Sequence, residues 1–203
     1  VRDNLEEAVQ QACLDWTAEG LHTPHRALIL GNTNELVETA NRLCQEHRLR
    51  AGCIDASSSV RVTDEQDDGC LESNVHVGDR ILCTRNSRSD GMQVENGTLG
   101  TVLAIRHFPP AIHAVLDDQR RVTLSVRSYP HIRLGYAVTT YRSQGASIPR
   151  LFVAVGGNLQ NLPASYVQAT RAIEDTSFYT TKDLLNPYLE NVASSPLVEE
   201  MSR

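Results

Sequence analysis

Hydrophobic residues follow two different periodicities in this chain, and the order of the two patterns limits the folds that it can adopt. The amino-terminal part shows helical spacing twice, from Leu5 to Trp16 and from Leu36 to Cys44. Asn4 and Glu7 have the spacing of a capping box at the start of the first helix. Short apolar runs flank the second helix and are expected to be strands, at 27–30 and 51–54. A strand, a helix and a strand in this order predict a parallel α/β layer.

The middle of the chain changes to short β-type runs separated by turn residues. Four strands are expected, at 80–84, 98–105, 112–116 and 121–126. Turn signals such as Asn-Gly at 96–97, Pro-Pro at 109–110 and Asp-Asp at 117–118 punctuate them at the interval of a small antiparallel barrel. Before these strands, the polar and acidic stretch 55–74 is expected to be a surface loop with one helical turn.

The α/β pattern returns after the β-type runs. A strand at 151–155, a helix from about Pro163 and a final strand at 177–181 are expected. The predicted fold class is therefore α/β. A parallel-sheet domain formed by residues 1–74 and 127–203 is interrupted by a small β-barrel at 75–126.

The charge of the chain is unevenly divided, although the net charge of −6 by itself argues against a nucleic-acid partner. Residues 1–79 carry 6 arginines and 15 acidic residues, residues 80–150 carry 10 arginines and 4 acidic residues, and the remainder carries 3 basic and 6 acidic residues. The middle is thus cationic. Arginine suits bidentate phosphate contacts and base stacking. A GC-rich genome would explain the preference for arginine equally well, but it does not explain the clustering.

The cysteines and histidines indicate neither a disulfide framework nor a metal site. The five cysteines are odd in number and never spaced as C-x-x-C, and His22 and His25 have no further ligand pair nearby in the sequence. No apolar run approaches the roughly 20 residues of a membrane-spanning helix, and the amino terminus lacks the pattern of a signal peptide. We therefore expect a cytoplasmic protein with reduced cysteines and no membrane partner.

Two motifs in the carboxy-terminal half carry the strongest functional signal. The first is GYAVTTYRSQGAS at 135–147, and the second is YVQATRA at 166–172. In this order and at this spacing they resemble motifs V and VI of superfamily one DNA helicases. Less specific resemblances to the same family, in its motif IV region and its barrel, are ILGNTN at 29–34 with ANR at 40–42, and VGDRI at 77–81 with NGTLGTV at 96–102.

The resemblance covers nearly the whole chain and implies the second motor domain of a RecD-like helicase or of a conjugative relaxase-helicase. Such a domain is RecA-like, of the P-loop NTPase type, and is interrupted by an SH3-like β-barrel. The implied activity is that of an ATP-dependent 5′-to-3′ DNA helicase or translocase, with single-stranded DNA as partner and ATP and Mg as cofactors. The chain begins at Val1 and not at a methionine, which is expected of a fragment. An N-terminal motor domain of the same protein would bind most of the nucleotide, and a relaxase or nuclease is a further implied partner.

The resemblance also assigns roles to single residues. Arg171 would be the arginine finger that stabilises charge on the transferred phosphoryl group, and Gln144 and Gly145 would couple to the nucleotide. DNA contacts are implied for five residues of the motif IV and motif V segments, namely Asn32, Thr33, Thr139, Tyr141 and Arg142. The family more often has His-Lys in place of Tyr141 and Arg142, which leaves the role of the tyrosine ring open.

Each assignment has an ordinary structural alternative. Arg171 could pair with Glu174 or Asp175 on a helix surface, while Thr139 and Tyr141 could be plain strand residues. The segment 32–34 could cap the second helix instead of binding phosphate. The arginines of the barrel could line a DNA channel or only solvate a small unit: Arg80, Arg85, Arg88, Arg106, Arg120 and Arg121.

The chain lacks motifs that a complete motor needs. No GxxxxGK[ST] occurs in it, and Asp64-Glu65 lacks the preceding hydrophobic strand of a magnesium-binding carboxylate pair. The fragment alone is therefore expected to be inactive as an ATPase. One alternative is a helicase-like DNA-binding or protein-interaction module without ATP turnover. Another is a barrel that recognises a protein through an exposed aromatic groove, for which only Phe108 and Tyr129 are available.

Overall fold

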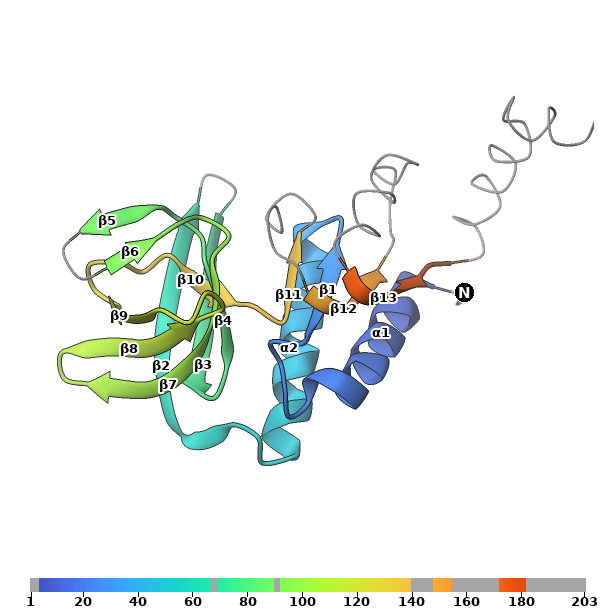
Figure 1. Ribbon diagram of the computed structural model, residues 1–203, viewed down its shortest axis with the longest axis horizontal. Helices are drawn as coiled ribbons and strands as arrows, with labels where there is room; N and C mark the ends of the chain where they lie inside the picture. The colour runs from blue at the N-terminus through green and yellow to red at the C-terminus, as the bar shows by residue number, and fades with distance from the viewer. Residues whose placement is uncertain (1–3, 67–68, 90–91, 140–147, 155–171, 182–203) are drawn as a thin grey trace, which may run out of the picture.

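The computed structural model of the 203-residue chain describes residues 4–66, 69–89, 92–139, 148–154 and 172–181. Its parallel part consists of α1 (Leu5–Gly20), β1 (Ala27–Gly31), α2 (Asn34–Arg50), β11 (Ala137–Thr139), β12 (Ile148–Ala154) and β13 (Ala172–Tyr179). The four strands form one sheet in the order β11-β1-β12-β13, and every neighbouring pair is parallel. The predicted parallel α/β layer is confirmed (Figure 1).

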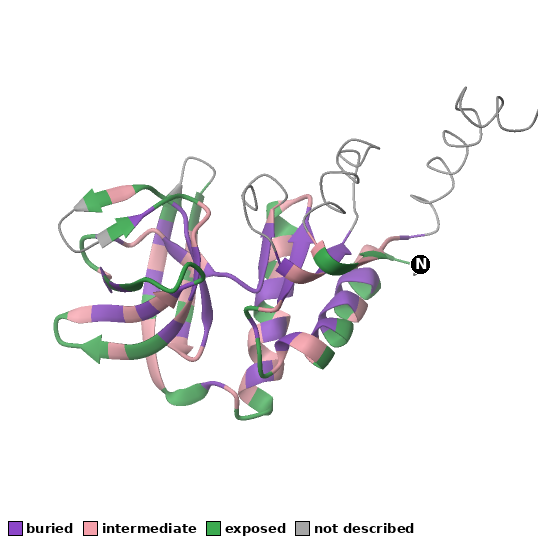
Figure 2. Cartoon of the chain, viewed as in Figure 1, coloured by how far each residue is buried: buried purple, intermediate pink, exposed green. Residues whose placement is uncertain are grey.

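Burial of the parallel sheet follows from its sequence. All five residues of β1 are buried, as expected of a strand that is covered on both faces. Helices α1 and α2 pack against each other and against the sheet, with their buried faces toward β1 (Figure 2). The expected capping interaction starts α1, since the Glu7 backbone N–H donates to Asn4 Oδ1 at 2.8 Å. Trp16 is fully buried, and its indole N–H donates to the carbonyl oxygen of Ala27 at 3.2 Å.

Between α2 and β11 the chain forms antiparallel strands, as the turn-separated runs predict. They are β2 (Asp55–Gln66), β3 (Gly69–Val77), β4 (Arg80–Cys83), β5 (Ser87–Ser89), β6 (Met92–Val94), β7 (Leu99–His107), β8 (Pro110–Leu116), β9 (Arg121–Ser125) and β10 (Ile132–Leu134). Five of them form a sheet in the order β10-β4-β7-β8-β9, while β2 pairs with β3 and β5 pairs with β6. We call residues 55–134 the antiparallel unit and the rest of the described chain the α/β unit.

Two sequence expectations are wrong. The stretch 55–74 is not a loop but most of a long hairpin, because Val62 and Val75 alternate with polar residues and are fully buried. The stretch 51–54 is not a strand, because Ala51 caps α2 and Gly52 takes a left-handed conformation with φ of 68° that ends the helix. In addition, β10 pairs with β4, so the antiparallel sheet extends to Leu134.

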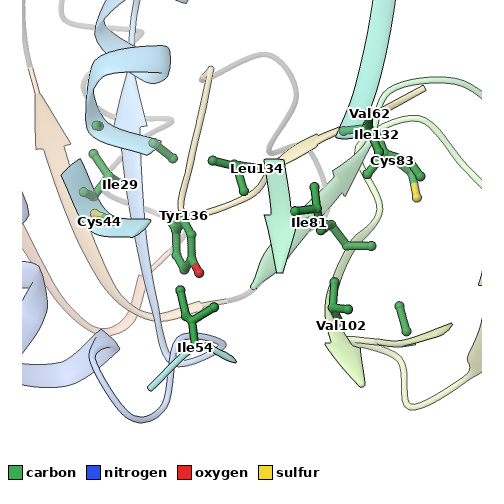
Figure 3. Close-up of a cluster of buried hydrophobic side chains, with 14 of the residues drawn as sticks. Ile29, Cys44, Ile54, Val62, Ile81, Cys83, Val102, Ile132, Leu134 and Tyr136 are labelled. Carbon is green, nitrogen blue, oxygen red and sulfur yellow. The ribbon is translucent and has the colours of Figure 1, made fainter. Parts of the chain in front are cut away.

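The two units share one apolar core (Figure 3). Figure 3 shows the Tyr136 side chain between Cys44 of the α/β unit and Leu134 of the antiparallel unit. Tyr136 is fully buried, and its ring meets Trp16 edge-on with the ring centroids 5.5 Å apart. Only Gly135 and Tyr136 separate β10 from β11. The shared core therefore fixes the point at which the chain passes from one sheet to the other.

Candidate nucleic-acid interface

The carboxyl ends of β1 and β11 lie side by side at one edge of the parallel sheet. Gly31 at the end of β1 is in register with Thr139 at the end of β11. Asn32 and Thr33 follow Gly31 directly, and both are half-buried, as is Thr139. In open α/β sheets, ligands bind outside the carboxyl ends of the strands. The structure thus brings three of the predicted DNA-contacting residues together, and we call Gly31, Asn32, Thr33 and Thr139 the carboxyl edge.

Helix α2 begins at the carboxyl edge with a capped amino terminus. Thr33 is its N-cap, and the Thr33 Oγ1 accepts a hydrogen bond from the Leu36 backbone N–H at 3.3 Å. The structural alternative, that this segment caps the second helix, is confirmed for Thr33. The cap uses a lone pair of the hydroxyl oxygen and leaves its hydrogen available as a donor. Glu35 in the first turn places a negative charge there, which weakens the attraction of this helix end for phosphate.

Asn41 on α2 holds the start of β11 in place. Its Oδ1 accepts hydrogen bonds from the backbone N–H groups of Tyr136 at 2.9 Å and Ala137 at 2.8 Å. Its Nδ2 donates to the carbonyl oxygen of Ala137 at 3.0 Å. Asn41 is 6% exposed, so all three bonds form largely out of contact with water. They fix the backbone of β11 just before Thr139.

A second buried network joins Tyr136 to the antiparallel unit. The Tyr136 hydroxyl donates to Asp79 Oδ1 at 2.5 Å, and Asp79 Oδ2 accepts from Gln45 Nε2 and the His76 backbone N–H, each at 2.7 Å. Arg48 Nη1 donates to the Tyr136 hydroxyl oxygen at 3.2 Å. Burial raises the pKa of Asp79 above its ordinary value of 3.8, and the hydrogen bonds that it accepts oppose this shift. Burial also raises the pKa of Tyr136 well above 10, so its hydroxyl stays protonated and donates.

Sequence reasoning missed the roles of Asp79, Gln45 and Arg48. Asp79 lies in a turn and the other two lie on a helix, positions where polar residues are normally solvated. The side-chain hydrogen bonds that join them to one another and to Tyr136 span 34 to 88 residues along the chain, so no local pattern indicates them. Asn41 belongs to the segment 40–42 that resembles the motif IV region of helicases, but its bonds to the backbone of β11 are visible only in the structure.

A cavity of about 440 Å³ lies beside the carboxyl edge, between α2 and strands β3, β10 and β11. Thr139 and Asn41 both line it. Its basic lining residues are already engaged, since Arg42 pairs with Glu46 at 3.0 Å and Arg133 pairs with Asp64 at 2.5 Å. Its acidic lining residues are Glu35, Glu38 and Glu72. Because the arginines are paired and the acidic residues outnumber them, a phosphate would be bound more favourably at the rim near Thr139 than inside the cavity.

The arginines of the cationic middle divide into paired and exposed ones. Arg80 is 1% exposed and donates two 2.7 Å hydrogen bonds to Asp117, so neither role expected for it, lining a DNA channel or solvating the unit, is correct. Arg120, Arg133 and Arg150 also form ion pairs. Five exposed arginines of the antiparallel unit form no ion pair with a carboxylate of the described residues: Arg85, Arg88, Arg106, Arg121 and Arg127. These five side chains provide the positive surface of the unit.

Asp64 joins β2 to β10 and to Thr84, the residue that follows β4. It is fully buried and accepts hydrogen bonds from Arg133 Nε at 2.5 Å and Thr84 Oγ1 at 3.0 Å. His131 Nδ1 lies 3.3 Å from the same carboxylate. Because these protein groups surround the Asp64 oxygens, the arrangement agrees with the conclusion that Asp64-Glu65 is not a magnesium-binding pair.

Five predicted site residues lie outside the described residues, namely Tyr141, Arg142, Gln144, Gly145 and Arg171. So does the helix expected from about Pro163. The structure does describe Glu174 and Asp175, the two carboxylates with which Arg171 would pair in the alternative interpretation. Glu174 pairs with Arg26 at 2.9 Å, and Asp175 pairs with Arg150 at 3.1 Å. Both carboxylates therefore have other partners.

Two curated relatives match most of this chain. The conjugal transfer protein TraA of Agrobacterium fabrum is 31% identical over 176 residues, and TraA of Rhizobium radiobacter is 29% identical over 174 residues. Each alignment covers 85% of this chain but only 15% of the relative, so the chain spans a small part of the relatives that it matches. No family model matches the sequence.

Solved structures give a fold-level match. The Pif1 helicase from Bacteroides in complex with ADP-AlF3 and single-stranded DNA superposes with a TM-score of 0.55 at 15% identity, over 96% of this chain and 55% of that chain. The chain shares its fold with this Pif1 helicase. A structure of two coordinating Pif1 helicases at forked double-stranded DNA gives a TM-score of 0.53 and covers 95% of this chain. The expected RecA-like, parallel-sheet architecture is thereby confirmed. None of the described helices is long and apolar enough to cross a membrane.

Proposed function

We propose that this chain is the second motor domain of a 5′-to-3′ DNA helicase or translocase that is part of a conjugative relaxase-helicase. Residues 1–74 and 127–203 correspond in this proposal to the RecA-like domain, and residues 75–126, which lie within the antiparallel unit, correspond to an inserted SH3-like barrel. The observation that carries it is the joint placement of Asn32, Thr33 and Thr139 at the carboxyl edge of a sheet with a helicase fold. The similarity to part of TraA, a conjugal transfer protein, supports the conjugative branch over the RecD-like one.

The carboxyl edge would bind backbone phosphates of single-stranded DNA. Thr33 and Thr139 offer hydroxyl donors and Asn32 offers an amide, groups that commonly contact phosphate without reading sequence. Tyr141 and Arg142 follow Thr139 along the chain and would add a ring and a positive charge. The bonds of Asn41 to the backbone of β11 keep Thr139 in a fixed position. A residue that binds a DNA phosphate in a defined geometry requires such a rigid support.

ATP and Mg would be bound mainly by an N-terminal motor domain of the same protein. The present chain does not fit that role, because it contains no GxxxxGK[ST] and its described residues hold no cluster of three potential metal ligands. From this chain, Arg171 would stabilise charge on the transferred phosphoryl group. Gln144 and Gly145 would connect the nucleotide to the carboxyl edge. A relaxase or nuclease would be a further partner.

The test of the DNA contact is a salt titration of the chain binding a fluorescein-labelled 20-nucleotide oligo(dT), followed by anisotropy. Wild-type affinity should fall as salt rises, because bound arginines release counterions from the DNA. A Thr139→Ala, Arg142→Ala double variant should bind about tenfold more weakly, since it loses a hydroxyl donor and a charge-assisted contact. Its salt slope should decrease by about 0.7, the value for one phosphate contact on a single strand.

The matched control is Thr17→Ala, which removes another half-buried threonine from α1, a helix that is not part of the carboxyl edge. It should bind like the wild type. Equal affinities of the double variant and the wild type, or an equal loss in the control, would refute the DNA contact at Thr139.

The nucleotide role is tested in the complete protein with Arg171→Ala. Turnover of ATP should fall by about 10³- to 10⁵-fold, as for other arginine fingers, while DNA affinity stays nearly constant. Unchanged turnover would reject the arginine finger. An absence of turnover already in the wild-type protein would instead favour a helicase-like DNA-binding or protein-interaction module.

A further inference from the structure

The turn between β7 and β8 exposes an aromatic ring in a position that usually carries polar residues. Phe108 is 88% exposed, more than any other large hydrophobic side chain of the described residues. Hairpin turns usually contain glycine, asparagine or aspartate, whereas this one reads His107-Phe108-Pro109-Pro110. Figure 1 places it at the end of the molecule away from α1 and β13. The ring is therefore well separated from the carboxyl edge.

The backbone around Phe108 is held by defined contacts. His107 pairs with Pro110 in the register of the hairpin. Arg106 Nε donates to the carbonyl oxygen of Pro109 at 3.1 Å, and the Val126 backbone N–H donates to the carbonyl oxygen of Pro110 at 3.1 Å. Proline also restricts the backbone of the turn itself. A ligand that stacks on the ring would therefore lose little free energy to ordering of the turn.

The surroundings of Phe108 are cationic. No aspartate or glutamate occurs among residues 96–116, which include the whole β7–β8 hairpin. Arg106 and His107 precede the ring and are exposed. Arg127 is exposed as well and follows Val126, the residue bonded to Pro110, so it belongs to the same end of the sheet. A ligand that fits here combines a flat unsaturated ring with negative charge.

We infer that Phe108 is a stacking contact for an unpaired base of single-stranded nucleic acid, with Arg106 and Arg127 facing the neighbouring phosphates. Aromatic stacking platforms within a cationic surface are a common way to hold single strands without sequence preference. The inference rests on the proposed function, which supplies the strand, and adds a second contact point on the antiparallel unit. A protein partner would use the apolar ring but would not require bases.

The experiment compares two probes of equal length and charge, a 20-nucleotide oligo(dT) and a 20-unit abasic oligodeoxynucleotide. Phe108→Ala should weaken oligo(dT) binding by about fivefold or more, the loss expected from one base–aromatic stack, and should leave binding of the abasic probe unchanged. Leu103→Ala is the matched control, because Leu103 is a 46%-exposed apolar residue on β7 of the same hairpin. It should bind both probes like the wild type.

Phe108→Trp gives an independent measurement. Its tryptophan fluorescence, after subtraction of the buried Trp16 signal of the wild type, should be quenched by oligo(dT) and not by the abasic probe. Equal oligo(dT) affinities of Phe108→Ala and wild type, without quenching in Phe108→Trp, would overturn the stacking contact. If the Thr139→Ala, Arg142→Ala variant still loses affinity in that case, the proposed function stands and only the second contact fails. A wild-type chain that binds neither probe would refute both.

Discussion

Replacing Asn41 by alanine tests how strongly α2 holds the strand that carries Thr139. The change removes three buried hydrogen bonds and leaves the N–H groups of Tyr136 and Ala137 and the carbonyl oxygen of Ala137 without this partner. Each buried group left unsatisfied costs about 1–3 kcal/mol. The adjacent cavity of about 440 Å³ is also lined by Asn41, so water can reach part of the site and reduce the loss. We expect the free energy of unfolding to fall by about 3 kcal/mol.

The assay is equilibrium unfolding in urea, monitored by fluorescence of Trp16, which is buried against Tyr136. With a slope of about 2.5 kcal/mol per molar urea, the midpoint should shift down by about 1.2 M. The matched control is Glu38→Ala, an exposed residue on the same helix that also lines the cavity. It should change the free energy of unfolding by less than about 0.5 kcal/mol.

DNA affinity provides a second readout for the same variant. Under conditions where Asn41→Ala remains folded, the loosened β11 should weaken oligo(dT) binding, while Glu38→Ala should not. A midpoint shift no larger than that of the control would refute the conclusion that Asn41 holds β11. A full shift without any loss of DNA affinity would show that the position of Thr139 does not depend on it.

Three further predictions concern buried groups. Asp117→Asn should lower the free energy of unfolding by about 2–3 kcal/mol in urea unfolding, less than for a fully buried pair because Asp117 is 37% exposed while Arg80 is buried. Gly135→Ala should lower the thermal midpoint, because a Cβ there would lie 2.7 Å from the Ile81 carbonyl carbon and force β10 away from β4; a midpoint equal to that of wild type would contradict the close approach. Because burial raises the pKa of Asp79, its stabilising contribution is present below pH 3.8 and decreases as pH rises through the raised pKa. The difference in unfolding free energy between wild type and Asp79→Asn should shrink over that range, and a constant difference would refute the shift.

The parallel layer could be predicted from the sequence because its signals are local. The fully apolar run of β1 and the helical spacing after Thr33 each occupy one short stretch, and burial on both faces of the sheet produces such runs. The turn signals of the antiparallel unit are local in the same way. The capping of α1 by Asn4 could also be predicted, because Asn4 and Glu7 are only three residues apart.

The parts that could not be predicted depend on partners distant in sequence. The β2–β3 hairpin looks like a loop because Asp64 occupies an inward position, where its charge is compensated by Arg133, 69 residues later. Asn41 and Ala137 are 96 residues apart, so no periodicity connects them. The meeting of Gly31 and Thr139 likewise depends on strand order, which no local pattern indicates.

The two-residue link between β10 and β11 has a mechanical consequence. Gly135 donates its N–H to the carbonyl oxygen of Arg80, and Tyr136 is bonded both to Asp79 of the antiparallel unit and to Asn41 of α2. Because both linking residues are held by hydrogen bonds, a displacement of the antiparallel sheet would displace β11 as well. A force that nucleic acid exerts on the β7–β8 hairpin would thus change the position of Thr139, which lies beyond the link.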